Sequence, residues 1–386
     1  MKVAVICDVL GEETNGATHA GMNFIRNLQM KGHDVTIVCP DEDKKGLKGY
    51  YVCPKRNFGP LNNFIKKVGV TIAKTDEKII GEAIKDADVI HLHLPFPMSN
   101  KAIEIAKKYD IPLTASFHMQ AENFTSYLKL QRFKRVNRAV YKFIYKHTYQ
   151  YVDAIHYPTE FIRNTFESNI KKKTNGYVIS NGVNPACEKR HAEKPEELKD
   201  KFVILSIGRL NYEKAQDVLI KATALSKYKD RIQLICAGQG PYKKKYEKLA
   251  KKLKISPMFK IFSRNDIVDC INYCDLYVHP ARIELEGIAC LEAIYCGRPT
   301  LVSDSKKSAT RLFAIDDKCI FKKDNPKDLA QKIDYFIEHE DERKEIGEKY
   351  FETAGKFDQK TCMDEMEKML IEAIKKHKNE KKKSEE

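Results

Sequence analysis

The sequence lacks any long apolar run. A membrane-spanning helix needs about 18 or more consecutive apolar residues, and no such stretch occurs. We therefore expect no transmembrane helix. The first residues, MKVAVICDVL, form a strand pattern with no small-residue cleavage site after them. We also expect no signal peptide.

The motifs of several protein classes are missing as well. The eleven cysteines are scattered through apolar segments, and no set of Cys or His follows the Cys270–Cys274 pair to complete a metal site. We expect buried, reduced thiols, as in a cytosolic protein, and no structural metal ion. There is no GxGxxG dinucleotide motif, RNP-like aromatic strand, zinc finger or helix-turn-helix pattern. These absences argue against nucleic acid as a partner.

Acidic residues are fewer than basic ones. The 69 Lys and Arg against 54 Asp and Glu give a formal net charge of +15. This excess favours a polyanionic partner, which can be nucleic acid, an anionic membrane surface or a phosphorylated substrate.

Strand and helix patterns alternate through both halves of the 386 residues. The first half gives strands at 2–8, 33–38, 88–92, 112–116, 154–157 and 177–179, and helices at 17–31, 99–109 and about 121–150. The second half begins with the strands FVILSIG and IQLICAG and ends with helices at about 326–339, 341–354 and 358–379. This rhythm predicts an α/β protein with two Rossmann-like, doubly wound domains facing each other across a cleft.

We expect three segments. Residues 1–183 form an N-terminal domain and residues 184–355 a second one. Residues 356–386 form a helix that packs back on the N-terminal domain, with a charged tail disordered beyond about Lys376. Ligands of such sheets bind at the carboxyl ends of the strands, so the residues just after the strands are the candidates for function.

Two loops after strands carry groups suited to a phosphate. Gly16 lies in the glycine-bearing loop GEETNGATHAG, which opens a helix whose amides can hold an anion. Arg209 and Lys214 lie in GRLNYEK, after the first strand of the second half. Two cations at the mouth of a sheet suit a diphosphate, although a plain turn and solvated surface charges are equally compatible with these residues alone.

A third loop carries carboxylates. In YVHPARIELEGIACLEAIYCG, Glu284 follows a strand, Gly287 frees the backbone, and a helix begins at Ile288. The first amides of that helix can bind an anion, and Glu292 lies in its early turns. Carboxylates accept hydrogen bonds from sugar hydroxyls. A diphosphate with a sugar on one side and a ribose on the other fits this pattern, which predicts a nucleotide-sugar site.

The same motifs resemble a known family. GRLNYEK, and Glu284 and Glu292 separated by seven residues and followed by Ala-Ile-x-Cys-Gly, resemble glycosyltransferase family 4, the retaining enzymes of the GT-B fold. ISNGV at 179–183 resembles that family's interdomain connection, and the resemblance covers roughly residues 1–355. SFHMQAENF, HPARIELEGIACLEA and SDSKKSATRLFAID resemble bacterial 1,2-diacylglycerol 3-glucosyltransferases.

The resemblance implies a role for each matching residue. Glu292 binds the ribose, Glu284 the hydroxyls of the transferred sugar, and His118 lies near the reacting sugar. Arg209 and Lys214 take the diphosphate, and Gly16 lies beside it. Gly287 and Ile288 are donor-binding candidates because of the free amides at the start of their helix. The family commonly has Gly-Phe-Gly after its first glutamate, whereas this sequence has Leu285, Glu286 and Gly287. We expect Glu286 to face solvent or a nearby lysine.

Two basic stretches of the N-terminal half, the acceptor half by this resemblance, combine apolar and cationic residues. Residues 123–152 hold seven Lys or Arg and no Asp or Glu, and residues 57–75 are similar in character. Such helices bind anionic membrane surfaces, although a packed helix with solvated lysines gives the same pattern. The candidate membrane-binding residues are Phe64, Lys66, Lys67, Arg132, Lys134, Arg135, Arg138 and Lys142.

The function expected from the resemblance is transfer of glucose from UDP-glucose to diacylglycerol by a cytoplasmic enzyme, peripheral on the inner face of the cell membrane. UDP-sugar is then a co-substrate, no cofactor is tightly bound, and Mg²⁺ can still assist the substrate. Two alternatives stay open: a family 4 transferase acting on a soluble glycan or a polyprenyl-linked sugar, and a non-enzymatic polyanion-binding protein on a Rossmann-like scaffold. Glucose and galactose are not distinguished.

Overall fold

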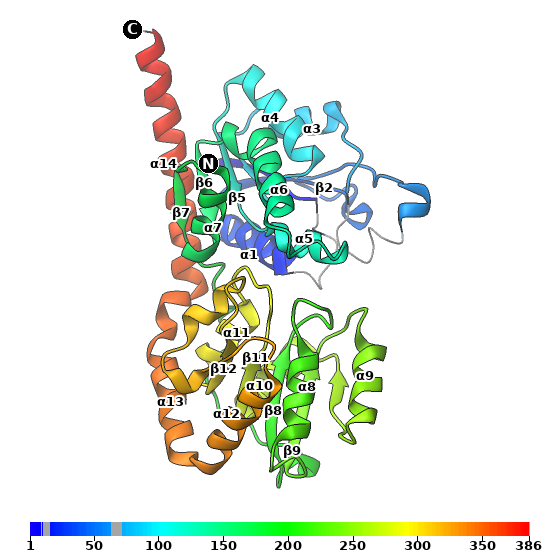
Figure 1. Ribbon diagram of the computed structural model, residues 1–386. Helices are drawn as coiled ribbons and strands as arrows, with labels where there is room; N and C mark the ends of the chain where they lie inside the picture. Colours follow the sequence, from blue (N-terminus) through cyan, green and yellow to red (C-terminus); the bar gives the residue numbers. More distant parts are fainter. Residues whose placement is uncertain (9, 11–15, 63–71, 386) are drawn as a thin grey trace. The chain divides into compact units, whose positions relative to one another are not determined.

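The computed structural model describes residues 1–8, 10, 16–62 and 72–385 of the protein. The chain divides into two compact units. Unit 1 consists of Met1–Asn181 and Cys362–Glu386, and unit 2 of Gly182–Thr361. Each unit contains one parallel β-sheet flanked by helices (Figure 1), which confirms the predicted α/β class with two doubly wound sheets.

Unit 1 contains a seven-stranded sheet in the order β3-β2-β1-β4-β5-β6-β7, parallel throughout. The strand order runs outward from β1 to β2 and β3 on one side and from β4 to β7 on the other, so the topological switch point, where such sheets bind ligands, lies at the carboxyl ends of β1 and β4. The strands are β1 Lys2–Ile6, β2 Asp34–Cys39, β3 Tyr50–Val52, β4 Val89–Leu92, β5 Leu113–Ser116, β6 Ala154–Tyr157 and β7 Gly176–Val178.

The helices of unit 1 follow the strands as the alternating pattern predicts. Asp76 caps α3 by accepting hydrogen bonds from the amides of Lys78 and Ile79, and Pro97 begins α4 at a position that needs no amide donor. The helices are α1 Gly16–Met30, α3 Glu77–Ile84, α4 Pro97–Tyr109, α5 Ala121–Tyr127, α6 Lys134–His147 and α7 Glu160–Ile170.

The single long helix predicted for about 121–150 is wrong. The chain forms α5 and α6 instead, separated by a turn in which Lys129 has a positive φ of 58°. The buried Asn137 explains the break. Its amide donates to the carbonyl of Gln131 at 3.0 Å, a backbone group of the turn that a continuous helix would bond internally. Its oxygen accepts from the Thr125 hydroxyl of α5 at 2.7 Å.

The C-terminal helix α14, Gln359–Glu385, lies along unit 1 (Figure 1). Met363, Met366, Met369, Leu370 and Ala373 are buried in the same apolar cluster as residues of β1, α1 and β2. The tail predicted to be disordered beyond Lys376 continues this helix. There His377 contacts Asp110 at 3.1 Å and Lys381 contacts it at 2.5 Å.

Unit 2 contains a six-stranded parallel sheet in the order β10-β9-β8-β11-β12-β13. Its strands are β8 Phe202–Ile207, β9 Ile232–Ala237, β10 Met258–Lys260, β11 Leu276–His279, β12 Thr300–Ser303 and β13 Ile320–Phe321. Its helices are α8 Gln216–Leu225, α9 Lys243–Lys252, α10 Arg264–Tyr273, α11 Ile288–Tyr295, α12 Pro326–Glu338 and α13 Glu340–Glu352.

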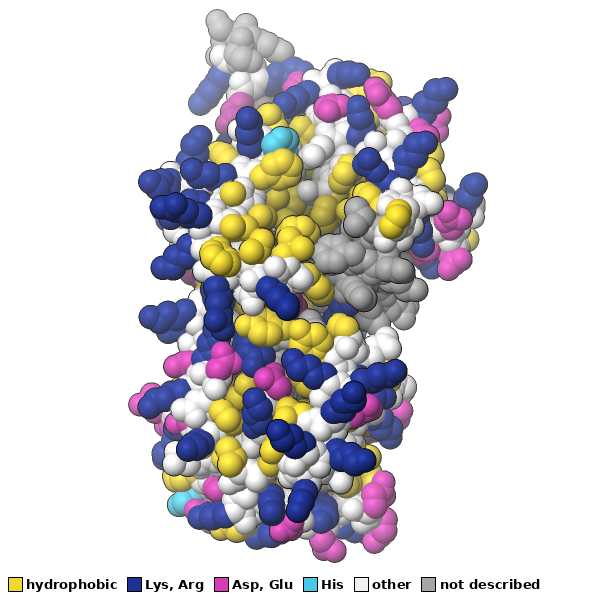
Figure 2. Space-filling model, turned by 45° about the vertical axis from the view of Figure 1, so that its right-hand side comes forward, with side chains coloured by type: hydrophobic (Ala, Val, Ile, Leu, Met, Phe, Trp, Pro, Cys, Tyr) yellow, Lys and Arg dark blue, Asp and Glu magenta, His cyan; other side chains and the backbone are white. Residues whose placement is uncertain are grey.

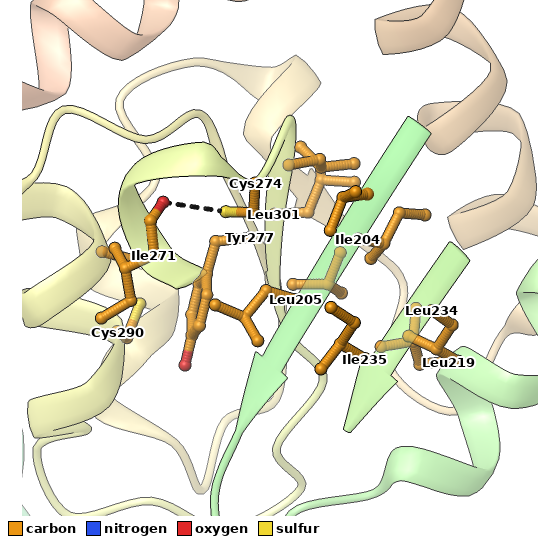
Figure 3. Packing of buried hydrophobic residues seen from close by; sticks show 14 of the residues in the cluster. Ile204, Leu205, Leu219, Leu234, Ile235, Ile271, Cys274, Tyr277, Cys290 and Leu301 are labelled. Carbon is orange, nitrogen blue, oxygen red and sulfur yellow. Dashed lines mark hydrogen bonds between the residues drawn. The ribbon is translucent and has the colours of Figure 1, made fainter. Parts of the chain in front are cut away.

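Branched and aromatic side chains fill the core of unit 2. Figure 3 shows Ile204 and Leu205 of β8 packed with Tyr277 of β11 and Leu301 of β12, all fully buried. Both faces of these strands are covered by helices, which explains why the strands read as continuous apolar runs. This rigid core fixes the loops at the carboxyl ends of β8 and β11.

Two further expectations concern the whole chain. All eleven cysteines are buried and none forms a disulfide bond, as predicted. Among the described residues, no helix is both long and apolar enough to cross a membrane. On the face drawn in Figure 2, Lys and Arg side chains are spread over both units.

Candidate functional site

The loop after β8 is held in one conformation by its neighbours in unit 2. Gly208 has φ 148°, and a Cβ on Gly238 would lie 2.3 Å from the Gly208 carbonyl oxygen, so only glycine permits this contact between the two loops. Asn211 accepts the amide of Lys214 at 3.0 Å, and its own carbonyl accepts the hydroxyl of Tyr246 at 2.6 Å. The loop therefore presents Lys214 from a fixed backbone.

Arg282 ties this loop to the segment after β11. Its guanidinium binds both carboxylate oxygens of Asp217, at 2.9 and 2.8 Å, and donates to the Tyr212 carbonyl at 2.9 Å. The backbone amide of Arg282 donates to the Glu213 carbonyl at 2.7 Å. The bidentate pair gives a fixed geometry, so the segment that carries Glu284 lies directly beside the one that carries Lys214.

Glu284 and Lys214 form an ion pair in this structure. The second partner of Glu284 is His279, whose Nε2 lies 3.0 Å from the same carboxylate oxygen. Burial opposes ionisation of Glu284, but Lys214 and His279 outweigh it and hold the pKa of the carboxyl at about 2. Burial lowers the pKa of His279 although Glu284 acts in the opposite direction. The carboxylate is therefore ionised at neutral pH and acts as an acceptor of hydrogen bonds.

The start of α11 lies next to this pair. Gly287 has φ 94°, and a Cβ there would lie 2.5 Å from Cγ2 of Thr310, so both the backbone conformation and the space require glycine. The amides of Cys290 and Leu291 donate to the Gly287 carbonyl at 2.8 and 3.1 Å. The amide of Ile288 is in the first turn and has no partner within the helix. This end of α11 suits an anion.

Glu292 is buried one turn further along α11. Arg264, the first residue of α10, donates to it from Nη1 at 2.9 Å and to Cys187 Sγ from Nη2 at 3.2 Å. The side chain of Glu292 is 9% exposed and that of Arg264 is 45% exposed. The carboxylate of Glu292 is therefore buried, whereas the guanidinium of Arg264 is accessible at the surface of unit 2.

In unit 2 the structure brings together Lys214, Glu284, Gly287 and the start of α11. Arg209 is half-buried on the same loop as Lys214, and its carbonyl accepts Nε2 of Gln216 at 3.2 Å. Glu286 was expected to face solvent or a nearby lysine, and the first alternative is wrong because this residue is 3% exposed. Close to it in sequence, the Glu284 amide donates to the Lys307 carbonyl at 3.1 Å and the Glu284 carbonyl accepts the Ala309 amide at 2.9 Å.

In unit 1, two candidates lie at the carboxyl edge of the sheet. Gly16 is exposed and is the first residue of α1. His118 is half-buried just after β5, with its ring next to those of His93 and His156, at centroid distances of 4.5 and 5.6 Å. Burial, and then the other histidines, hold the pKa of His118 well below its usual value. His118 is therefore neutral at neutral pH.

The predicted membrane residues on α6 and just before it are exposed. They are Arg132, Lys134, Arg135, Arg138 and Lys142. The opposite face of the helix is anchored by the buried side chains of Asn137, Tyr141 and Ile144. Of the apolar residues, Phe133 and Phe143 are 56% and 60% exposed. Phe64, Lys66 and Lys67 lie outside the described residues.

Sequence reasoning missed three residues of this site. His279, Arg282 and Arg264 each make polar contacts to a predicted residue or to its loop. His279 and Arg282 stand within five residues of Glu284, after the same strand, and that position was the available signal. Arg264 is remote in sequence from Glu292, and only the packing of α10 against α11 brings the two together.

Comparison with known proteins gives a consistent result for both halves. The family model described as "Glycosyl transferases group 1" matches residues 188–353, and "Glycosyltransferase Family 4" matches residues 14–186. An alpha-monoglucosyldiacylglycerol synthase of Streptococcus pneumoniae is 26% identical over 228 residues, 55% of this chain and 51% of the relative. One of Acholeplasma laidlawii is 23% identical over 328 residues, 78% of this chain and 80% of the relative. The chain thus spans about half the length of the first relative and most of the second.

Among solved structures, HepE of Anabaena in complex with UDP and glucose aligns with 96% of this chain and 100% of its own. The TM-score is 0.74 and the identity 17%. At this identity the likeness concerns the fold, two Rossmann-like domains of the same type.

Proposed function

Because the chain belongs to the family 4 glycosyltransferases, which have the GT-B fold, we propose that it is a retaining hexosyltransferase that moves glucose from UDP-glucose to diacylglycerol. The observation that carries the donor side is the cluster of Lys214, Glu284 and Glu292 around the start of α11. The acceptor side is supported by the distant similarity to the two monoglucosyldiacylglycerol synthases.

In this proposal unit 2 binds the donor. Arg209, Lys214 and the Ile288 amide hold the diphosphate, with Gly287 allowing the backbone to approach it. Gly16 is a further proposed contact of the diphosphate. Lys214 is paired with the ionised carboxylate of Glu284. When the diphosphate binds, the ammonium of Lys214 therefore contacts both anions. Glu284 then accepts hydrogen bonds from the sugar hydroxyls, and Glu292 accepts them from the ribose.

The reaction needs charge stabilisation more than acid catalysis, since the leaving group is a nucleoside diphosphate. The bond between the anomeric carbon and the β-phosphate oxygen breaks, and its electron pair stays on UDP. The acceptor oxygen bonds to the same face of the anomeric carbon, and its proton passes to the departing diphosphate oxygen. His118 is neutral and contributes a hydrogen bond near the sugar, not a proton. No tightly bound cofactor is required, and Mg²⁺ would act only as a stimulant through the substrate.

The acceptor is a lipid in this proposal, so the enzyme works at the inner surface of the cell membrane as a peripheral protein. The exposed basic residues around α6, with Phe133 and Phe143 beside them, support an anionic membrane surface as the docking partner.

The test is an assay of glycosyl transfer by the purified protein against a panel of donors and acceptors. Donors are UDP-glucose, UDP-galactose and GDP-mannose; acceptors are diacylglycerol, a sterol, a polyprenyl-linked sugar and a soluble glycan. Mass spectrometry identifies the product, and NMR coupling of the anomeric proton reports retention. We expect an α-glucosyl lipid from UDP-glucose and diacylglycerol. Transfer to another acceptor only would refute the lipid assignment, and an inverted product would refute the front-face mechanism.

A further inference from the structure

His93 lies one residue after β4, is 1% exposed, and has no role in the site described above. Its Nε2 lies 2.7 Å from the carbonyl oxygen of Ala17, in the first turn of α1. A carbonyl oxygen only accepts, so Nε2 must carry the hydrogen. Burial lowers the pKa of His93 to about 4, and the neutral ring is therefore a donor with a defined tautomer.

The imidazole ring of His93 also packs against the ring of His118. The two ring centroids are 4.5 Å apart and the planes are tilted by 47°. On another side His118 meets the edge of His156, whose Nδ1 and Nε2 are fixed by Ser116 Oγ at 2.9 Å and by the Ile179 carbonyl at 2.7 Å. His118 is thus confined by two rings that are themselves hydrogen-bonded to the backbone or to a strand residue.

The position of His93 depends on a glycine in α1. A Cβ on Gly21 would lie 3.1 Å from both Cε1 and Nε2 of His93. Glycine inside a helix costs about 1 kcal/mol relative to alanine, so this residue type needs a local reason. The space that Gly21 leaves for the imidazole supplies that reason.

We propose that His93 is a positioning residue that couples the first turn of α1 to the ring of His118. One nitrogen anchors the turn that begins at Gly16, and the ring face orients His118. This inference rests on the proposed function, in which Gly16 contacts the donor diphosphate and His118 the transferred sugar. It adds that both contacts are set by one side chain.

Two substitutions separate the two tasks. His93→Phe keeps a ring beside His118 but removes the donor to Ala17. His93→Gln keeps an N–H that can reach Ala17 but removes the ring. In the Phe variant we expect hydrogen exchange of the amides in residues 17–24 to rise at least tenfold, with weaker UDP binding in calorimetry. In the Gln variant we expect exchange and UDP affinity close to wild type, but kcat at least tenfold lower and altered His118 signals in histidine-selective ¹⁵N NMR.

His33→Gln is the matched control, because this histidine belongs to the same unit, precedes β2 and bonds to Glu367 at 2.6 Å. Gly21→Ala is a third variant that displaces the ring without changing His93, and it should combine both defects in milder form. Unchanged exchange in the Phe variant, or identical defects in the Phe and Gln variants, would overturn the proposal. Hydrogen exchange and NMR require no acceptor substrate. These two measurements therefore test the coupling between α1 and His118 even if the wild-type protein transfers no glucose.

Discussion

Nη1 of Arg264 lies 2.9 Å from Oε1 of Glu292, and this contact links the first residue of α10 to the early turns of α11. Glu292 is nearly enclosed, whereas Arg264 is half accessible. A buried carboxylate without a partner is costly, so Arg264 compensates the burial of Glu292 and fixes one of its oxygens. In the proposed function this carboxylate accepts hydrogen bonds from the ribose, so its orientation depends on Arg264.

We therefore predict that Arg264→Ala raises the donor KM about tenfold with a smaller effect on kcat, because Glu292 loses its orientation toward the ribose. Glu292→Ala should raise the same constant at least as much, since the acceptor itself is removed. Arg264→Lys should be intermediate, because lysine keeps the charge but not the fixed fork. Initial rates against UDP-glucose concentration measure all three.

Arg190→Ala is the control for these variants. Arg190 also pairs with a carboxylate of this region, but its partner is Asp269 on α10, at 2.6 Å. The donor KM of the Arg190→Ala variant should match that of the wild type. A normal donor KM in Glu292→Ala would remove the ribose assignment.

A second prediction concerns Lys214. Lys214→Ala and Arg209→Ala should each lower kcat/KM at least tenfold, about 1.4 kcal/mol of transition-state stabilisation, because each removes a cation from the departing diphosphate. Lys214→Ala should also lower the melting temperature, since the buried Glu284 carboxylate loses its cationic partner and keeps the hydrogen bond from His279, whose pKa burial lowers. Glu284→Gln in the Lys214→Ala background should recover part of that stability but not the activity.

Lys221→Ala on the exposed side of α8 is the matched lysine control and should change neither quantity. Wild-type kinetics in both Lys214→Ala and Arg209→Ala would place the diphosphate elsewhere.

The fold could largely be predicted from the sequence, because the strands are covered on both faces and therefore read as continuous apolar runs. The prediction failed where tertiary contacts decide local structure. The break between α5 and α6 depends on the side chain of Asn137, and the helical order beyond Lys376 is accompanied by contacts to Asp110. Neither partner can be identified from spacing along the chain.

The site shows the same limit. Positions just after strands predicted Lys214 and Glu284 as candidates, because parallel strands present their following loops at one edge. Their direct ion pair depends on β8 and β11 being neighbours in the sheet, although two strands separate them in sequence. The burial of Glu286, which is 3% exposed, was not predicted from its position in the loop.

A third prediction follows from the histidines of unit 1. Burial lowers the pKa of His91, His93, His118 and His156 from the ordinary 6.5, to about 4 for His93 and His156. Between these values the unfolded chain binds protons that the folded chain does not, so the stability of unit 1 should fall as pH falls from 6.5 toward 4. Urea unfolding at several pH values, with hydrogen exchange to assign the unit, measures the slope.

Asp8 acts in the opposite direction. Burial raises the pKa of its carboxyl from 3.8 to about 7, so the folded state holds a proton that the unfolded state releases, and this contribution is lost as pH rises through that range. Near pH 5 it therefore offsets part of the proton uptake that the histidines cause on unfolding. Asp8→Asn removes this offset and should steepen the slope. An unchanged slope in this variant would show that Asp8 is ionised in the folded protein.

The last prediction concerns the membrane. If the surface around α6 docks on anionic lipid, replacing the exposed Lys134, Arg135 and Arg138 with Glu should reduce co-sedimentation with anionic vesicles and activity on diacylglycerol, while UDP binding survives. Each basic residue near such a surface contributes about 1 kcal/mol. Salt should release wild-type protein only in part, because the Debye length falls from about 10 Å at 0.1 M to about 3 Å at 1 M while the burial of Phe133 and Phe143 persists.

The matched control carries the same change in net charge on another surface. Lys244, Lys248 and Lys251 are exposed on α9 of unit 2, and their triple replacement with Glu removes as much positive charge without touching α6. If membrane binding depends on the α6 surface, the control should pellet with anionic vesicles nearly as well as the wild type. Equal losses in both triple variants would mean that net charge alone governs binding. Equal pelleting of the α6 variant and the wild type at every lipid composition would exclude this surface and favour a soluble acceptor.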